Sequence, residues 1–325
     1  MKAIIAHRSG EPRLVELDIP PAGKRNVIVR VTHLALQLPD EHLFLKSVGK
    51  TVSDDVDGLP LGSLCSGIIE SVGPEVRRLR EGLRIAAFSQ PYVYHAQYLS
   101  VPETNCIELP KRVSHEEGSF TGIGISALNL FRRSECQIGS KLIIFGAGML
   151  GILLAQIAIS AGVHPVVVDL DESKRTKARN VGVQDLHSIN LKEITSHIMQ
   201  LTNGLGVDTM IYTLDSPPSC ENWPLELLRD QGKIMLTNRN LASPNSKTLA
   251  ETRCVLTYDN GSPTETNDPR WTKLENAQVF LDLLSERKVQ VTPLVTERTP
   301  LDRAISLYEK IQRTGFTTVG AVLTC

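Results

Sequence analysis

The stretch Lys141-Leu142-Ile143-Ile144-Phe145-Gly146-Ala147-Gly148-Met149-Leu150-Gly151 decides the fold. An apolar run leads directly into the pattern G-x-G-x-x-G, and an apolar helical segment follows at 152–159. A second short apolar run at 166–168 ends in Asp169. Strand, glycine turn, helix and second strand in this order predict a βαβ unit that binds a dinucleotide.

Each glycine of the pattern has its own predicted role. Gly146 lets the chain leave the strand in a tight turn, and Gly148 has no Cβ, so a pyrophosphate can approach the backbone. Gly151 lets the helix pack close to the strand. At the helix N-terminus, Met149 and Leu150 are predicted to offer backbone N–H groups and a partial positive charge to the phosphates.

Asp169 predicts which dinucleotide is bound. It lies 18 residues after Gly151, where an acid that binds the adenosine ribose is expected. A carboxylate there would repel a 2′-phosphate, so NAD(H) is favoured over NADP(H). The alternative is that Asp169 only caps the next helix. Lys174 and Arg175 either contact the adenosine side or form a solvated helix face, and Arg175 near the ribose would weaken the preference for NAD.

Further along the chain, two strand ends are expected to face the nicotinamide. Thr213 and Leu214 follow the strand predicted at 207–212, and Thr237 follows the one at 233–236. In open parallel sheets, ligands bind outside the carboxyl ends of the strands.

Composition excludes several classes of partner. The 325 residues carry 35 basic and 36 acidic side chains, with no basic block that would attract nucleic acid or an anionic membrane. The N-terminal segment does not resemble a signal peptide, and no apolar run approaches the roughly 20 residues that span a bilayer. These features predict a soluble, cytoplasmic protein. Its six cysteines are scattered singly, without the spacing of a disulfide framework or a zinc knuckle.

The pattern changes along the chain. Up to about residue 115, many short strands with Gly/Pro turns indicate a small β barrel or sandwich. From Lys141, strands alternate with helices, which indicates a doubly wound parallel sheet and the α/β class. The tail is predicted to form a strand at 290–295, a helix at 301–313 and a strand at 318–323, and to pack on the N-terminal domain.

Several stretches together resemble the medium-chain dehydrogenase/reductase superfamily. They are "GSLCSGIIESVGPEV" from Gly62, "KLIIFGAGMLGILLAQIAISAG" from Lys141 and "VVVDLDESKRTKARNVG" from Val166. The resemblance implies a GroES-like catalytic domain at 1–117, a Rossmann NAD-binding domain at 118–264 and a return segment at 265–325 that completes the catalytic domain. It also implies a homodimer and a small-molecule substrate.

The positions that match the family's zinc ligands depart from its pattern. Gln37 stands where the zinc members have the cysteine of C-x-x-D, Ser63 matches the histidine that follows glycine, and Ile123 falls on the third ligand. These residues cannot supply the imidazole, thiolate or carboxylate donors that Zn²⁺ requires. The closely spaced cysteines of the structural zinc lobe are also absent between Arg84 and Tyr98. We therefore expect neither a catalytic nor a structural zinc.

Without zinc, hydrogen-bond donors must polarise the substrate oxygen. By position, Gln37 and Ser63 are candidates for that role. His42 matches a proton-relay histidine of the zinc members, but Pro39 replaces the hydroxyl residue that starts the relay, so a solvent-exposed loop histidine is the alternative. Tyr94 and His95, favoured over Tyr92, are candidates to protonate a carbonyl, although aromatic side chains in strands usually pack.

These inferences predict a zinc-independent, NAD(H)-dependent oxidoreductase acting on an alcohol/ketone pair, with polyol- or sugar-like substrates favoured. One alternative is an enone or quinone reductase, whose substrates are already activated. The other is a protein that binds a dinucleotide without turnover.

Overall fold

The structure is a computed structural model of the 325-residue chain, and it describes residues 1–37, 41, 44–48, 58–214, 224–237, 255–258, 271–314 and 318–325. The chain divides into two compact units. The β-rich unit comprises Met1–Gly122, Arg270–Arg287 and Leu294–Cys325, and the parallel-sheet unit comprises Ile123–Pro269 and Lys288–Pro293.

A six-stranded sheet forms the centre of the parallel-sheet unit, and every neighbouring pair of its strands is parallel. In spatial order its strands are β11 (Leu186–His187), β10 (His164–Val168), β9 (Lys141–Phe145), β12 (Val207–Tyr212), β13 (Leu228–Leu236) and β14 (Val255–Tyr258). Counted along the chain, this is the order 3-2-1-4-5-6 of a doubly wound dinucleotide-binding sheet. The predicted fold class of this unit is confirmed.

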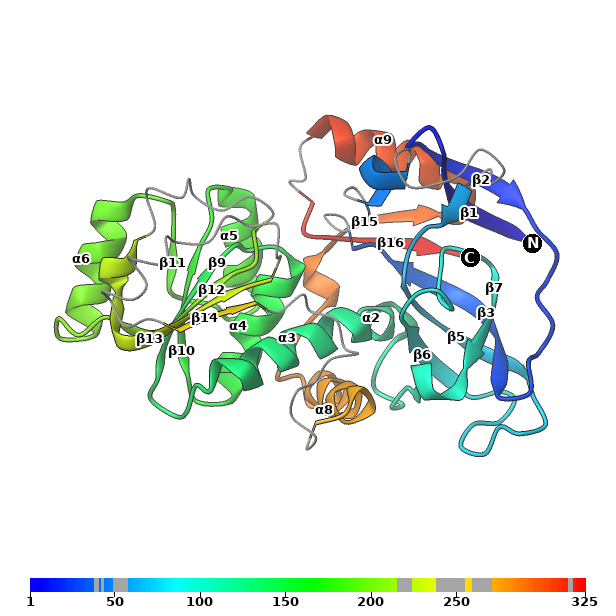
Figure 1. Ribbon diagram of the computed structural model, residues 1–325, viewed down its shortest axis with the longest axis horizontal. Helices are drawn as coiled ribbons and strands as arrows, with labels where there is room; N and C mark the ends of the chain where they lie inside the picture. The colour runs from blue at the N-terminus through cyan, green and yellow to red at the C-terminus, as the bar shows by residue number, and fades with distance from the viewer. Residues whose placement is uncertain are drawn as a thin grey trace. The chain divides into compact units, whose positions relative to one another are not determined.

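Helices lie on both sides of this sheet, with α6 on one side and α3 and α4 on the other (Figure 1). The packing follows strand alternation, because Ile143 and Phe145 of β9 share a core cluster with Ile194 and Ile198 of α6. The helices of the unit are α3 (Thr121–Ser134), α4 (Met149–Ser160), α5 (Glu172–Asn180) and α6 (Leu191–Leu201).

The β-rich unit contains a seven-stranded and a three-stranded sheet. The larger sheet has the order β15-β16-β3-β5-β6-β8, with β7 paired to β3, and the smaller one has the order β2-β1-β4. The N-terminal strands are β1 (Lys2–His7), β2 (Pro12–Glu16), β3 (Asn26–Ala35), β4 (Gly58–Pro60), β5 (Leu64–Val72), β6 (Arg84–Phe88), β7 (Tyr98–Pro102) and β8 (Cys106–Glu108). This GroES-like, largely antiparallel architecture confirms the β-rich class predicted for the first part of the chain.

The C-terminal segment belongs to the larger sheet, where β16 (Gly320–Thr324) pairs antiparallel with β3 and parallel with β15 (Val295–Pro300). The predicted strand at 290–295 is wrong, since Thr292–Leu294 is a 3-10 turn and the strand starts at Val295. Pro293 explains the difference, because it has no N–H for a sheet ladder. The segment's helices are α8 (Lys273–Ser285) and α9 (Ala304–Thr314).

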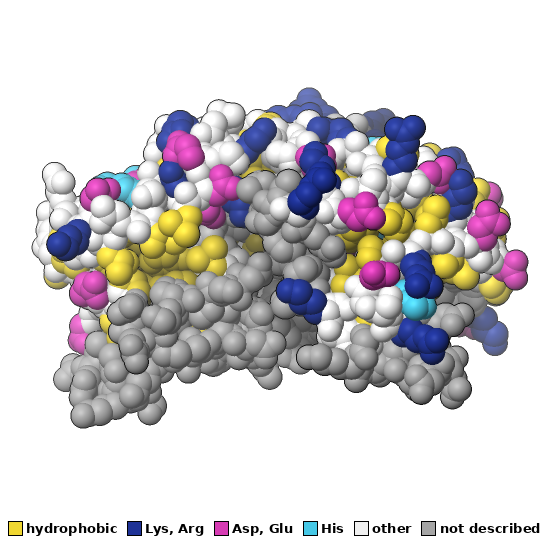
Figure 2. Space-filling model, turned by 90° about the horizontal axis from the view of Figure 1, so that it is seen from above, with side chains coloured by type: hydrophobic (Ala, Val, Ile, Leu, Met, Phe, Trp, Pro, Cys, Tyr) yellow, Lys and Arg dark blue, Asp and Glu magenta, His cyan; other side chains and the backbone are white. Residues whose placement is uncertain are grey.

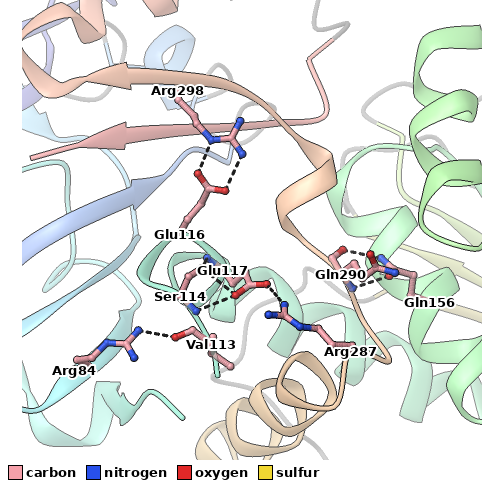
Figure 3. A network of polar contacts seen from close by, with 9 residues as sticks. All are labelled: Arg84, Val113, Ser114, Glu116, Glu117, Gln156, Arg287, Gln290 and Arg298. Carbon is pink, nitrogen blue, oxygen red and sulfur yellow. Dashed lines mark hydrogen bonds and ion pairs between the residues drawn. The ribbon is translucent and has the colours of Figure 1, made fainter. Parts of the chain in front are cut away.

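Two acidic residues of α2 (His115–Ser119) hold the returning chain (Figure 3). Glu116 binds the guanidinium of Arg298 with both carboxylate oxygens, at 2.6 and 2.8 Å. Glu117 accepts from Arg287 Nη1 at 2.5 Å and also forms a capping box with Ser114. Residues about 170 positions apart in the chain are thereby joined within the β-rich unit.

In the parallel-sheet unit, a buried glutamine of α4 fixes the segment Lys288–Pro293. Gln156 is 2% exposed and exchanges two hydrogen bonds with the backbone of Gln290, at 2.8 and 3.1 Å (Figure 3). These bonds satisfy a polar side chain that an otherwise apolar helix buries.

Basic and acidic side chains are interspersed on the face shown in Figure 2. This agrees with the balanced composition of the chain. Within the described ranges, no helix combines the length and the apolar character needed to cross a membrane.

Candidate functional site

The glycine turn after β9 has the local geometry that the sequence predicts. Gly146 has a φ of +115°, and a Cβ on it would lie 2.6 Å from the Oγ1 of Thr213. A Cβ on Gly151 would lie 1.9 Å from the carbonyl oxygen of Gly146, so only glycine fits. The tight turn at Gly146 and the close approach of α4 at Gly151 are confirmed.

Gly148 differs from these two glycines because a Cβ there would meet no described heavy atom within 4 Å. It is the N-cap residue of α4, and no side chain in the described part of the chain caps this helix end. The N–H groups of Met149 and Leu150 belong to the first helical turn, which lacks carbonyl partners inside the helix. Open space beside free N–H groups suits an anionic group such as a pyrophosphate.

Asp169 lies beside the glycine turn and is 5% exposed. Its Oδ2 accepts from the backbone N–H of Ala147 at 2.7 Å, and its Oδ1 accepts from that of Asp171 at 2.8 Å. The cap of α5 is Asp171, which accepts from Ser173 N–H at 2.8 Å. The helix-capping role considered for Asp169 is thus filled by Asp171. Asp169 instead ties the glycine turn to the end of β10, and each carboxylate oxygen keeps a further lone pair.

The side chain of Arg175 binds two groups close to it in the sequence. Its guanidinium donates to the backbone oxygen of Asp169 and to the carboxylate of Glu172, and its side chain is 11% exposed. Glu172 therefore balances the charge that would otherwise favour a 2′-phosphate. Lys174, its neighbour on α5, is half-buried.

The carboxyl ends of β9, β12 and β13 lie at one level, because the parallel register pairs their last residues with one another. Thr213 N–H and Oγ1 donate to the carbonyl of Phe145, at 2.9 and 3.1 Å, and Leu214 lies close to Gly146. Thr237 donates its N–H to the end of β12. The structure thus brings Gly146, Thr213, Leu214 and Thr237 to one edge of the sheet.

In the β-rich unit, the structure brings Gln37 and Ser63 together. The hydroxyl of Ser63 donates to the Oε1 of Gln37 at 2.5 Å, and both residues are half-buried. Gln37 follows β3 and Ser63 precedes β5, two strands that pair antiparallel. This pairing explains how residues 26 positions apart become neighbours.

Behind this pair lies a buried polar network that the sequence does not reveal. The carboxylate of Glu41 accepts from the backbone N–H of Gln37 at 3.0 Å and from the hydroxyl of Tyr308 at 2.5 Å. His95 Nε2 lies 3.2 Å from the same carboxylate. Burial would raise the pKa of Glu41, but the nearby His95 and these hydrogen bonds outweigh it and hold the pKa below its ordinary value.

His95 is fully buried, and a Cβ on Gly62 would lie 2.5 Å from its ring. The imidazole is therefore packed between Gly62 and Glu41. It can hold the carboxylate of Glu41 in place, but it has no exposed surface that could contact a substrate. No local pattern could have found this network, because Glu41 and Tyr308 are 267 residues apart.

The remaining catalytic candidates take no part in the described hydrogen bonds of the Glu41 network. Tyr94 is half-buried against the core of the β-rich unit, where burial raises the pKa of its phenol. Tyr92 is 43% exposed. His42 lies outside the described residues, as does Pro39.

Comparisons with known proteins agree with this architecture. Residues 150–257 match the family described as zinc-binding dehydrogenase. Sorbitol dehydrogenase of Gallus gallus is 24% identical, over 96% of this chain and 93% of the relative. The crystal structure of 2R,3R-butanediol dehydrogenase from Bacillus subtilis superposes with a TM-score of 0.81 at 19% identity, covering 100% and 99% of the two chains.

The chain is similar to medium-chain dehydrogenases along almost its whole length, in sequence and in fold. A mycobacterial quinone oxidoreductase has the same fold, with a TM-score of 0.81, 21% identity and complete coverage of both chains. The fold is therefore shared by alcohol and quinone enzymes and does not choose between them.

The residues predicted to stand at the superfamily's zinc-ligand positions do not have the chemistry of zinc ligands. Gln37 and Ser63 at the ligand positions offer an amide and a hydroxyl that hydrogen-bond to each other, and Ile123 offers no donor atom. Structural and catalytic Zn²⁺ sites use thiolate, imidazole or carboxylate ligands. A dinucleotide, in contrast, fits the glycine turn, the free N-terminus of α4 and the acid that ends β10.

Proposed function

We propose that this dehydrogenase uses NAD(H) without zinc to interconvert an alcohol and a ketone, with a polyol- or sugar-like substrate. The observation that carries the proposal is the Ser63–Gln37 pair, a hydrogen-bond donor pair where zinc members place metal ligands. The similarity to sorbitol dehydrogenase and to 2R,3R-butanediol dehydrogenase supports the substrate class.

The residues proposed to hold NAD are those of the parallel-sheet unit. They are Gly146, Gly148, Met149, Leu150, Gly151, Asp169, Thr213, Leu214 and Thr237, with Arg175 behind Asp169. Nicotinamide supplies the hydride donor or acceptor of the reaction at its C4. Asp169 supports NAD over NADP because the 2′-phosphate of NADP would meet a buried carboxylate. Arg175, which binds the backbone oxygen of Asp169, is paired with Glu172.

For the substrate, Ser63 and Gln37 are the proposed donors. The Gln37 amide N–H groups would hydrogen-bond to the substrate oxygen, and the Ser63 hydroxyl would do so after it rotates away from Gln37 Oε1. Both would stabilise the negative charge that develops on this oxygen during reduction. Glu41 supports this geometry by binding the Gln37 backbone N–H, and His95 and Tyr308 hold Glu41 in place. Tyr94 remains the proposed alternative donor, while His95 is proposed as a positioning residue.

Cofactor titrations test the first half of the proposal. NADH and NADPH binding, measured by fluorescence, should favour NADH in the native protein. Asp169→Asn should weaken NADH binding at least about tenfold, equivalent to about 1.4 kcal/mol. Asp171→Asn is the matched control, since asparagine also caps helices. It should leave the ratio of NADH affinity to NADPH affinity unchanged. Native preference for NADPH would overturn the assignment of Asp169.

Turnover assays test the second half. A panel of polyols, ketones and quinones is assayed with and without a chelator, and zinc content is measured on the same sample. We expect alcohol or ketone turnover that the chelator does not affect. Ser63→Ala and Gln37→Ala should each lower kcat about 10–100-fold, as loss of one oxyanion donor does, with NADH affinity retained. Ser71→Ala on β5 is the control.

Other results would support one of the alternative functions. Activity confined to quinones or enones identifies a reductase of activated substrates, and NADH binding without turnover identifies a cofactor-binding protein. Stoichiometric zinc required for activity would refute the zinc-free mechanism. The homodimer and the cytoplasmic location stay predictions, and light scattering of the purified protein tests the former.

A further inference from the structure

Three histidines and one aspartate converge at the outer edge of the parallel sheet. The Oδ1 of Asp185 lies 2.7 Å from His187 Nε2. Its Oδ2 lies 2.9 Å from the Nε2 atoms of both His164 and His197. The carboxylate is 12% exposed, and the imidazoles are between 25% and 47% exposed.

Three separate elements build this cluster. His164 is the first residue of β10, His187 is the last residue of β11, and His197 lies on α6. Asp185 and His187 are two residues apart at the edge strand, so their side chains lie on the same face. The rings of His187 and His197 are 4.4 Å apart between centroids. The arrangement depends on tertiary packing, since the four residues span 33 positions.

We propose that this cluster is a structural site for a divalent transition-metal ion, with Zn²⁺ the best match. It is separate from the catalytic site and from the cysteine lobe, where the sequence predicts no zinc, and its metal takes no part in the reaction. Asp185, His187 and His197 place one carboxylate oxygen and two imidazole nitrogens close together, and His164, which contacts the same carboxylate, is the candidate for the fourth ligand of tetrahedral zinc. A simple ion pair needs one histidine for each carboxylate. Here three imidazoles present the same ring nitrogen to one carboxylate, two of them to a single oxygen.

The distances fit a metal after a small adjustment. Zinc-to-ligand bonds of about 2.0–2.1 Å place tetrahedral donor atoms about 3.4 Å apart. The observed contacts of 2.7–2.9 Å are about 0.5 Å shorter than that. The donor atoms of Asp185, His187 and His197 already lie within 4.8 Å of one another, whereas His164 stands outside this group and its ring must move towards the other two imidazoles to join them. Partly exposed imidazoles can open by this amount through rotation of their side chains.

A metal ion bound here would connect the short edge strand β11 to β10 and α6. β11 has two residues and pairs only with β10 among the described strands. The carbonyl of His187 also accepts from the N–H of Asp169 at 3.1 Å, so the cluster adjoins the acid assigned to the cofactor. Metal coordination would couple β10, β11 and α6 and contribute to folding stability. The proposal does not depend on the reaction that the enzyme catalyses.

Metal titration of untagged, chelator-stripped and reduced protein tests the site. Zn²⁺ binding by calorimetry should show one ion per chain, Tm should rise with zinc concentration, and Co²⁺ should give the visible absorption of tetrahedral coordination. His187→Ala and His197→Ala should each weaken Zn²⁺ binding by more than about 100-fold, beyond the typical effect of an outer-shell change. His7→Ala, at a histidine of the β-rich unit, is the control and should change nothing.

His164→Gln provides a second test because its side chain is the most exposed of the four. It should keep the fold and still weaken zinc binding. No Zn²⁺ binding to the native protein, or equal binding by His164→Gln and the native protein, would overturn the proposal.

Discussion

The glycine turn after β9 and the Ser63–Gln37 region achieve their geometry in different ways. The turn is made of backbone, and its decisive property is the absence of Cβ atoms at Gly146, Gly148 and Gly151. The Ser63–Gln37 region is made of side chains supported by the buried carboxylate of Glu41. The first has the glycine pattern of the superfamily, and the second is predicted to depart from its zinc-ligand pattern.

Under the proposed function, this difference is how one fold keeps its cofactor and changes its chemistry. Backbone N–H groups at a helix N-terminus bind a dinucleotide whatever the reaction is. Side chains that face a substrate can be exchanged as long as their buried supports are satisfied. The comparison predicts that changes in the turn act on folding and cofactor binding, whereas changes around Glu41 act on the β-rich unit alone.

The largest effect is expected at the turn. Gly151→Ala places a Cβ 1.9 Å from a backbone oxygen, so the turn cannot keep its form, and we expect at least about 4 kcal/mol of destabilisation. Gly148→Ala meets open space among the described atoms and should change stability by less than about 1 kcal/mol while it weakens NADH binding. Urea denaturation and NADH titration measure both quantities. Equal destabilisation by the two variants would contradict the assigned roles.

A smaller effect is expected at Glu41. Glu41→Ala leaves the buried His95 and Tyr308 without their common acceptor, which should cost about 3 kcal/mol. NADH affinity should stay unchanged, because Glu41 belongs to the β-rich unit. Tyr308→Phe is the control and removes one hydrogen bond, worth about 1 kcal/mol. Denaturation curves decide the matter, and a neutral Glu41→Ala would refute the network.

The next effect depends on pH. Burial, and then the charge of Arg84, lower the pKa of His115 to about 4. The native state therefore binds fewer protons than the unfolded state between about pH 6.5 and 4, and stability should fall as the pH is lowered through that window. Because His115 is half-exposed, we expect a loss of about 1–2 kcal/mol.

His115→Gln, which cannot be protonated, should flatten this pH dependence. The measurement is the difference between the two proteins in unfolding free energy at pH 7 and pH 4.5. Parallel pH profiles for both proteins would exclude His115 as the cause.

The smallest effect separates the two neighbouring acids of the cofactor unit. Asp171→Ala removes the cap of α5 and should cost about 1 kcal/mol. Because Asp171 does not bind the glycine turn in the described contacts, the preference for NADH should be retained. A change of cofactor preference in Asp171→Ala would mean that Asp171, and not Asp169, contacts the ribose.

Local chemistry made the cofactor half of the candidate site predictable. The glycine pattern, the apolar run before it and Asp169 lie within 29 residues, and their meaning depends on strand and helix geometry that short segments encode. The parallel, doubly wound sheet follows from repeated alternation of strand and helix. The tail was less predictable, because Pro293 shifts the strand to Val295 and only its pairing with β16 defines it.

The substrate half depended on contacts between distant residues. Sequence positions suggested Gln37 and Ser63, but the pairing of β3 with β5 was needed to make them neighbours. His95 read as a possible proton donor, yet packing against Gly62 and Glu41 places it in the core. Periodicity reports which face of a strand is buried, and it cannot report which distant side chain lies opposite.

The sequence by itself determined the class of fold, the glycine turn and the acid that ends β10, because these features follow from backbone freedom and hydrophobic pattern within short segments. Only the tertiary structure decided that Asp169 also holds the turn, that Glu41 joins Tyr308 and His95, and that three histidines meet at Asp185. Hydrogen bonds between such groups form only after strands and helices pack. Bringing distant residues together costs chain entropy, and only the burial of the whole core offsets that cost.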